Sequence, residues 1–128
     1  MDHRFCMMDA KELAQIRPGL FGAIVAGEQA TVVRWEFAPG MARTGIHWHD
    51  DHEQFGLVVS GRIETEIAGE VRQLGPGDIY YVPRKVPHGH TLVIGDEPVA
   101  LVDFFTPPRA DYVAAASGGA AVDPVNRT

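Results

Sequence analysis

Turn-forming residues interrupt this chain at short intervals from residue 18 onward. Runs of apolar or alternating residues end at each of these turns, which are Pro18-Gly19, Pro39-Gly40, Ser60-Gly61, Pro76-Gly77-Asp78 and Gly95-Asp96. The runs between turn signals are four to eight residues long, which is too short for packed helices and is typical of strands in a small sandwich or barrel. The sequence therefore predicts an all-β protein.

About eight strands are expected, enough for one small barrel. The expected segments are 30–37, 44–49, 54–60, 62–67, 71–74, 79–82, 88–94 and 99–106. The length of 128 residues favours one domain, 1–128, with its barrel over about 30–106.

The two ends differ from this pattern. A short N-terminal helix is predicted because Asp9 and Glu12 have capping-box spacing, with Leu13 and Ile16 as its apolar stripe. Near the other end, 109–116 is expected to form one or two helical turns. Residues 117–128 are small and polar, which predicts a flexible tail.

The charge balance narrows the possible partners. Lys and Arg number 11 against 17 Asp and Glu, a net charge of -6, so neither nucleic acid nor an anionic membrane is an expected partner. No apolar run is long enough to span a bilayer, and the N-terminus lacks the pattern of a secretory signal. Cys6 is the only cysteine, so no internal disulfide forms. The cytoplasm is the expected location.

Histidines cluster in the middle of the chain. Two of them, His47 and His49, are two residues apart and so share one face of a strand. A histidine pair, a third histidine from another strand and one carboxylate or amide make a metal site with open positions. The five clustered histidines are His47, His49, His52, His88 and His90.

Two segments around these histidines resemble known motifs. HWHDDHEQFGLVVSG resembles the first cupin motif, and GPGDIYYVPRKVPHG resembles the second; together they span residues 40–90. The resemblance implies a double-stranded β-helix, or jelly-roll barrel, that binds one divalent ion (Zn, Ni, Mn, Fe or Co). By motif position the ligands would be His47, His49, His88 and either Glu53 or Gln54.

Adjacent residues of a strand face opposite ways, so only one of Glu53 and Gln54 readily joins the metal. If Gln54 points inward, Gly56 lies beyond it and leaves space for substrate, whereas the other register places Phe55 there. We therefore favour Gln54, with Glu53 as the alternative. His52 is interpreted as a solvated loop residue.

The last predicted strand carries a carboxylate among apolar residues. Alternation places Leu101, Asp103 and Phe105 on one face. A buried carboxylate is costly unless it is paired or functional, so Asp103 either acts inside the barrel or faces solvent, where Arg34 could pair with it.

DFFTPPRADY is similar to the end of small cupins that linearise unsaturated uronates. That resemblance implies catalytic roles for Asp103, Phe105 and Arg109. It implies a metal-dependent lyase or isomerase that opens a small unsaturated sugar acid, with Arg62 or Arg109 pairing with the substrate carboxylate.

Further pocket residues and partners follow from the same reasoning. Tyr81 is expected as an aromatic pocket wall, and His90 shares the strand parity of His88, which places it in the cavity or at an exposed strand end. Trp35 fits the core better. Small single-domain cupins usually pair, which implies a homodimer. The alternative functions are a metal-dependent dioxygenase or polyketide-type cyclase, and a non-catalytic ligand-binding cupin.

Overall fold

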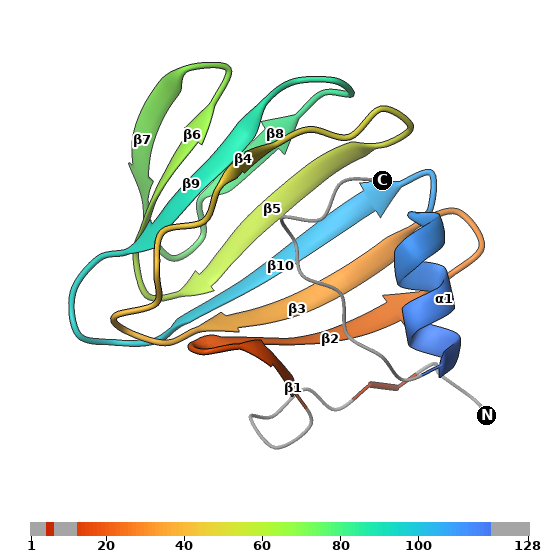
Figure 1. Cartoon of the computed structure of the whole chain (residues 1–128), viewed down its shortest axis with the longest axis horizontal. Helices are drawn as coiled ribbons and strands as arrows, with labels where there is room; N and C mark the ends of the chain where they lie inside the picture. The colour runs from red at the N-terminus through yellow and green to blue at the C-terminus, as the bar shows by residue number, and fades with distance from the viewer. Residues whose placement is uncertain (1–4, 7–12, 119–128) are drawn as a thin grey trace.

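The computed structural model describes residues 5–6 and 13–118. The strands in this part of the chain form two antiparallel sheets that face each other, as Figure 1 shows. In spatial order, the six-stranded sheet contains β1 (Ala14–Arg17), β2 (Leu20–Ala26), β3 (Thr31–Phe37), β10 (Val99–Thr106), β5 (Glu53–Ser60) and β8 (Ile79–Val82). The four-stranded sheet contains β4 (Ile46–His47), β9 (His88–Val93), β6 (Ile63–Ile67) and β7 (Glu70–Leu74). The predicted all-β jelly-roll architecture is confirmed.

The N-terminal helix prediction is wrong where the structure can test it. Residues Ala14–Arg17 form β1, which pairs with β2 as a hairpin around Pro18-Gly19. Gly19 has a φ of 81°, the left-handed conformation that a tight turn needs. Backbone pairing with β2 therefore overrides the helical spacing of Leu13 and Ile16. The proposed cap at Asp9 and Glu12 lies outside the described residues.

The sheet also begins earlier than the predicted barrel limit of about residue 30. All of β2 is in register with β3, from Leu20 opposite Phe37 to Ala26 opposite Thr31. The segment 20–26 was missed because its apolar residues do not alternate with polar ones. Both β1 and β2 are therefore part of the large sheet.

The chain ends its described part in one helix, α1 (Ala110–Gly118), which contacts β2 (Figure 1). This confirms the helical turns expected from residue 109, and it places Ser117 and Gly118 in the helix rather than in a tail. Residues 119–128 lie outside the description. No helix among the described residues is long and apolar enough to span a membrane.

Strand β10 runs through the middle of the large sheet, between β3 and β5. Its side chains alternate, so Leu101, Asp103 and Phe105 are buried between the sheets while Phe104 is exposed. On β3 the same alternation buries Val33 and Trp35. This alternation brings one carboxylate into the centre of an apolar core.

Candidate functional site

Three histidines from two parts of the small sheet meet inside the barrel. His47 on β4 pairs in register with His88 on β9, and His49 follows two residues after His47. All three side chains are buried, and one ligand nitrogen of each lies within 4.8 Å of the others. The His47 and His88 ring centroids are 4.3 Å apart. The spacing is compatible with three ligands of one ion.

The hydrogen bonds of this cluster leave metal-binding atoms available. Nδ1 of His88 lies 2.9 Å from the carbonyl oxygen of Val86, so this nitrogen carries the hydrogen and donates it. Within the described residues, Nε2 of His88, both ring nitrogens of His49 and Oε1 of Gln54 are buried without a hydrogen-bond partner. Buried acceptors are normally satisfied. These donor atoms therefore fit a divalent ion.

Burial favours the neutral form of two of these imidazoles, those of His49 and His88. Desolvation, with smaller contributions from Arg109 and His88, lowers the pKa of His49 to about 2. Desolvation also lowers the pKa of His88, although its bond to the Val86 carbonyl opposes the shift. A neutral imidazole has the lone pair that a metal needs, so neither His49 nor His88 needs to lose a proton near pH 7 to bind an ion.

Glu53 and Gln54, the two alternatives for the fourth ligand, are adjacent on β5, so their side chains lie on opposite faces of the strand. Gln54 is buried and lines the central cavity, whereas Glu53 is half-buried in an outer groove with Tyr81. The space for substrate that was expected beyond Gln54, at Gly56, is occupied by the ring of Tyr80. A Cβ on Gly56 would lie 2.0 Å from Cζ of Tyr80, so the missing side chain makes room for that ring rather than for substrate.

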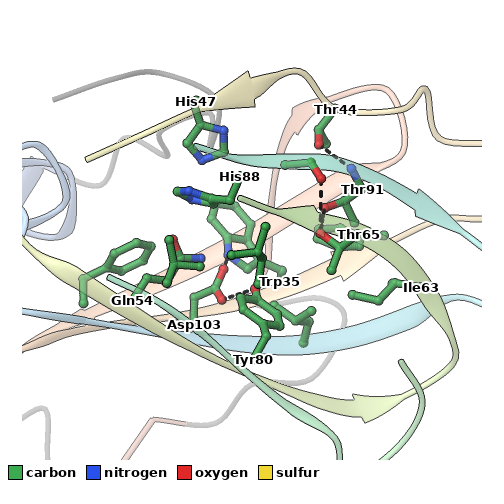
Figure 2. Close-up of a pocket in the computed structure, with 16 residues that line it drawn as sticks. Trp35, Thr44, His47, Gln54, Ile63, Thr65, Tyr80, His88, Thr91 and Asp103 are labelled. Carbon is green, nitrogen blue, oxygen red and sulfur yellow. Dashed lines mark hydrogen bonds between the residues drawn. The ribbon is translucent and has the colours of Figure 1, made fainter. Parts of the chain in front are cut away.

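The cavity lies between the two sheets and measures about 50 Å³ (Figure 2). Its polar wall includes Gln54, Tyr80, His47, His88 and Asp103. Three threonines add hydroxyl groups to the wall. Those of Thr65 and Thr91 are 2.9 Å apart, and that of Thr44 accepts a 2.9 Å hydrogen bond from the backbone N–H of Thr91. The remaining lining residues are Trp35, Phe37, Ile63, Ile67, Val82, Gly89, Leu101 and Phe105.

Among the residues that the structure describes, Asp103 is the only carboxylate that lines this cavity, and it has two aromatic hydrogen-bond donors. The indole N–H of Trp35 donates to Oδ2 over 2.9 Å, and the hydroxyl of Tyr80 donates to Oδ1 over 2.5 Å. Burial raises the pKa of Asp103 to about 6, although Tyr80, Gln54, Trp35 and the charge of Arg109 each oppose the shift. A carboxyl group with such a pKa can both take and give a proton near neutral pH.

Of the other two predicted catalytic residues, Phe105 lines the cavity and Arg109 does not. The guanidinium carbon of Arg109 lies 3.7 Å from the ring centroid of Tyr112 and 5.0 Å from that of Phe105. Its Nε and Nη2 donate to the two carboxylate oxygens of Asp111 over 3.0 and 2.7 Å. Arg109 therefore supports the back of the Phe105 ring.

The three other predicted pocket residues do not line this cavity. Arg62 is exposed at the β5–β6 turn. Tyr81 is exposed because its neighbour Tyr80 takes the inward position on β8. His90 loses the parity of His88 because Gly89 and His90 have φ values of 133° and 49°; its Nδ1 lies 3.2 Å from Oε1 of Glu66.

The interpretation of His52 as a solvated residue is wrong, and two parts of the cavity wall, Tyr80 and the threonines, were not predicted. His52 is buried rather than solvated, with its ring centroid 4.6 Å from that of His49 and 5.4 Å from that of Phe105. Tyr80 was missed, although the buried Val82 two residues later marks its face of β8. The cavity threonines gave no sequence signal, because threonine is common on any strand.

Comparisons with known proteins agree with this architecture. The family model described as a cupin domain matches residues 33–105, which include the histidine cluster and Asp103. The pectin degradation protein KdgF of Dickeya dadantii is 32% identical over 111 residues, covering 86% of this chain and 98% of that protein.

Two solved structures are similar over most of their length. KdgF from Halomonas sp. has 32% identity and a TM-score of 0.71, covering 83% of this chain and 98% of that one. An RmlC-like cupin from Shewanella frigidimarina has 28% identity and a TM-score of 0.74, covering 87% and 96%. The resemblance inferred from the sequence motifs is thereby confirmed.

Proposed function

Because the chain belongs to the cupin domain family, we propose that it is a metal-dependent enzyme that opens a small unsaturated sugar acid as an isomerase or lyase. The observation that carries the proposal is the buried carboxylate of Asp103 in the cavity that His47 and His88 also line. Similarity to a pectin degradation protein supports a uronate as the substrate class.

The residues that would hold the ion are His47, His49, His88 and Gln54. All four are uncharged ligands, so a divalent ion bound there keeps its full charge and would supply a Lewis acid to the oxygens of an anionic substrate. None of the cavity-lining residues, all in the described part of the chain, is lysine or arginine. Attraction for a carboxylate would therefore come from the metal centre.

Asp103 would move the proton. Opening a 4,5-unsaturated uronate removes a proton from the anomeric hydroxyl, breaks the C1–O5 bond, and delivers a proton to C4 as C5 becomes a ketone. The proton count is unchanged, so one carboxyl group can act first as base and then as acid. A pKa of about 6 suits both roles.

The remaining walls would bind the sugar. Thr65 and Thr91 offer hydroxyls on the cavity wall, and Phe105 offers a flat apolar surface. Ligand pockets usually measure about 300–1,000 Å³, well above the 50 Å³ of this cavity. Substrate entry therefore requires the walls to move apart.

The test is a time course of metal-loaded protein with 4,5-unsaturated galacturonate, following loss of the conjugated alkene by ultraviolet absorbance. We expect rapid loss with the wild-type protein and a rate about 100- to 10,000-fold lower with Asp103→Ala, at equal metal content. Full activity of Asp103→Ala would contradict the mechanism.

An inactive wild-type protein with metal bound would contradict the proposed substrate. Iron-dependent oxygen uptake would then favour a dioxygenase, and ring closure of a polyketide-type substrate would favour a cyclase. Ligand binding without metal would favour a non-catalytic cupin.

We also propose that the protein acts as a homodimer. Phe55 on β5 and Phe104 on β10 are cross-strand partners on the outer face of the large sheet, and both are more than a third exposed. Val59 and Ile79 extend this apolar surface. A two-fold axis through the face would bring the same patch of two copies together and bury it.

A further inference from the structure

The carboxylate of Asp103 is held by donors from strands on both sides of β10. Trp35 belongs to β3, next to β10, and its indole N–H donates to Oδ2 over 2.9 Å. Tyr80 belongs to β8, two strands away beyond β5, and its hydroxyl donates to Oδ1 over 2.5 Å. Figure 2 shows both rings converging on this side chain. Each carboxylate oxygen thus has its own fixed donor.

A glycine makes the reach of Tyr80 possible. Asp103 pairs with Gly56, and Gly56 pairs with Tyr80, so the three residues form one row across the sheet. A Cβ on Gly56 would lie 2.0 Å from Cζ and 2.5 Å from the hydroxyl oxygen of Tyr80. The phenol therefore crosses β5 over the one residue without a side chain.

The indole ring of Trp35 also packs over a glycine, on the neighbouring strand β2. It pairs with Gly22 on β2, where a Cβ would lie 2.6 Å from Cζ3 of the indole. Neither Gly22 nor Gly56 has a positive φ, so no turn geometry requires glycine at these positions. Gly56 therefore provides the space across which the phenol reaches Asp103, and Gly22, on the far side of β3 from β10, accommodates the indole ring.

We infer that Tyr80 and Trp35 are positioning residues that fix the carboxylate of Asp103 toward the cavity, and that Gly56 is required for the Tyr80 contact. The inference rests on the proposed function, in which Asp103 transfers the proton. Two donors on two different oxygens prevent rotation of the carboxylate plane. The orientation is therefore set before substrate binds, and transition-state stabilisation depends on such preorganisation.

The first experiment compares Tyr80→Phe with Tyr81→Phe on the unsaturated uronate. The two tyrosines are neighbours on β8, but Tyr81 points to the outer face, so its variant is the matched control. We expect Tyr80→Phe to lower kcat about 10- to 100-fold with KM changed less than about 3-fold. Tyr81→Phe should match the wild type, and bound metal should be equal in all three proteins.

A second variant displaces the phenol without removing it. In Gly56→Ala the new methyl group occupies the space of the Tyr80 ring, so kcat should fall as in Tyr80→Phe. Gly27→Ala is the control, because a Cβ there meets its nearest neighbour at an ordinary 3.5 Å. Melting temperatures identify any variant that fails to fold, and Trp35→Phe then provides the same test from the opposite side.

A double-mutant cycle separates positioning from a general structural effect. In an Asp103→Asn background, Tyr80→Phe should lower the residual rate less than about 2-fold, because the carboxylate that it orients is gone. Additive losses would overturn the inference, as would a Tyr80→Phe protein with wild-type kcat. A wild-type protein without activity on the uronate would overturn the proposed function and the inference together.

Discussion

Glu53 and Gln54 are neighbours on β5, yet the side chain of Gln54 lies in the cavity and that of Glu53 lies in an outer groove. The buried Oε1 of Gln54 has no hydrogen-bond partner among the described residues. We therefore expect Gln54→Ala to weaken metal binding at least about 10- to 100-fold, which is the range for losing a group that merely orients a metal ligand. Competition with a chromophoric chelator measures this affinity, and Glu53→Ala is the control. Equal losses in both variants would contradict the assignment.

Metal removal should lower thermal stability. An ion that binds only the folded state stabilises it by about 2.7 kcal/mol at 100 times Kd, or roughly 10 °C in Tm for a chain of this length. Calorimetry with and without EDTA measures the difference. In His49→Ala the difference in Tm should disappear. In His90→Ala it should remain, because the ring of His90 lies beside Glu66 outside the cavity. The same Tm with and without chelator would count against a resident metal.

Local alternation explains why much of this architecture was predictable. The predicted limits of 79–82 and 99–106 coincide with β8 and β10, because apolar runs bounded by Pro and Gly leave little freedom in register. Alternation placed Asp103 on the face of Leu101 and Phe105, but it left open whether that face points into the barrel, and the structure shows that it does. The histidine cluster could be predicted because the spacing of its residues matches the cupin motifs.

Other features depended on contacts that no local pattern contains. The contact between Tyr80 and Asp103 depends on the space over Gly56, which lies between them on β5. His90 left the parity of its strand because Gly89 and His90 adopt positive φ values. Arg109 is remote in sequence from the histidines, and only the packing of α1 shows that it stacks behind Phe105.

In the metal-free protein, Asp103 should contribute less to the free energy of unfolding as the pH rises. In the folded protein the pKa of Asp103 is about 6, against 3.8 for the ordinary group, because burial disfavours its charged form. Between pH 3.8 and about 6, the folded state therefore binds more protons than the unfolded state. The contribution of Asp103 is largest below about pH 4 and falls by about 3 kcal/mol as the pH passes through 6.

Urea unfolding of the EDTA-treated protein from pH 4 to pH 7 tests this sign against Asp103→Asn. Three buried histidines, His49, His52 and His88, have lowered pKa values and shift stability in the opposite direction. Because all three are present in both proteins, their contributions cancel in the difference. A difference between the two proteins that stays flat with pH would show that Asp103 does not titrate in this range.

Arg109→Met should destabilise the protein by about 2–3 kcal/mol. Its side chain is wholly buried and pairs with Asp111, which is 30% exposed, and removing one partner of a buried ion pair leaves the other uncompensated. The exposure of Asp111 keeps the cost at or below the lower end of the range for such pairs. Urea unfolding measures it, and Arg62→Met, at an exposed site, should change stability by less than about 0.5 kcal/mol. Unchanged stability with lost turnover would mean that Arg109 acts on substrate directly.

The outer face of the large sheet should control assembly. Phe55 and Phe104 are cross-strand neighbours on this face, so in a two-fold dimer a charge at Phe55 would enter the interface from both copies. We expect sedimentation to show a wild-type dimer and a Phe55→Glu monomer. Val71→Glu is the matched control, since Val71 is as exposed as this face but lies on β7 of the other sheet. A Phe55→Glu protein that remains dimeric would place the interface elsewhere, because like charges facing each other across an apolar contact oppose association.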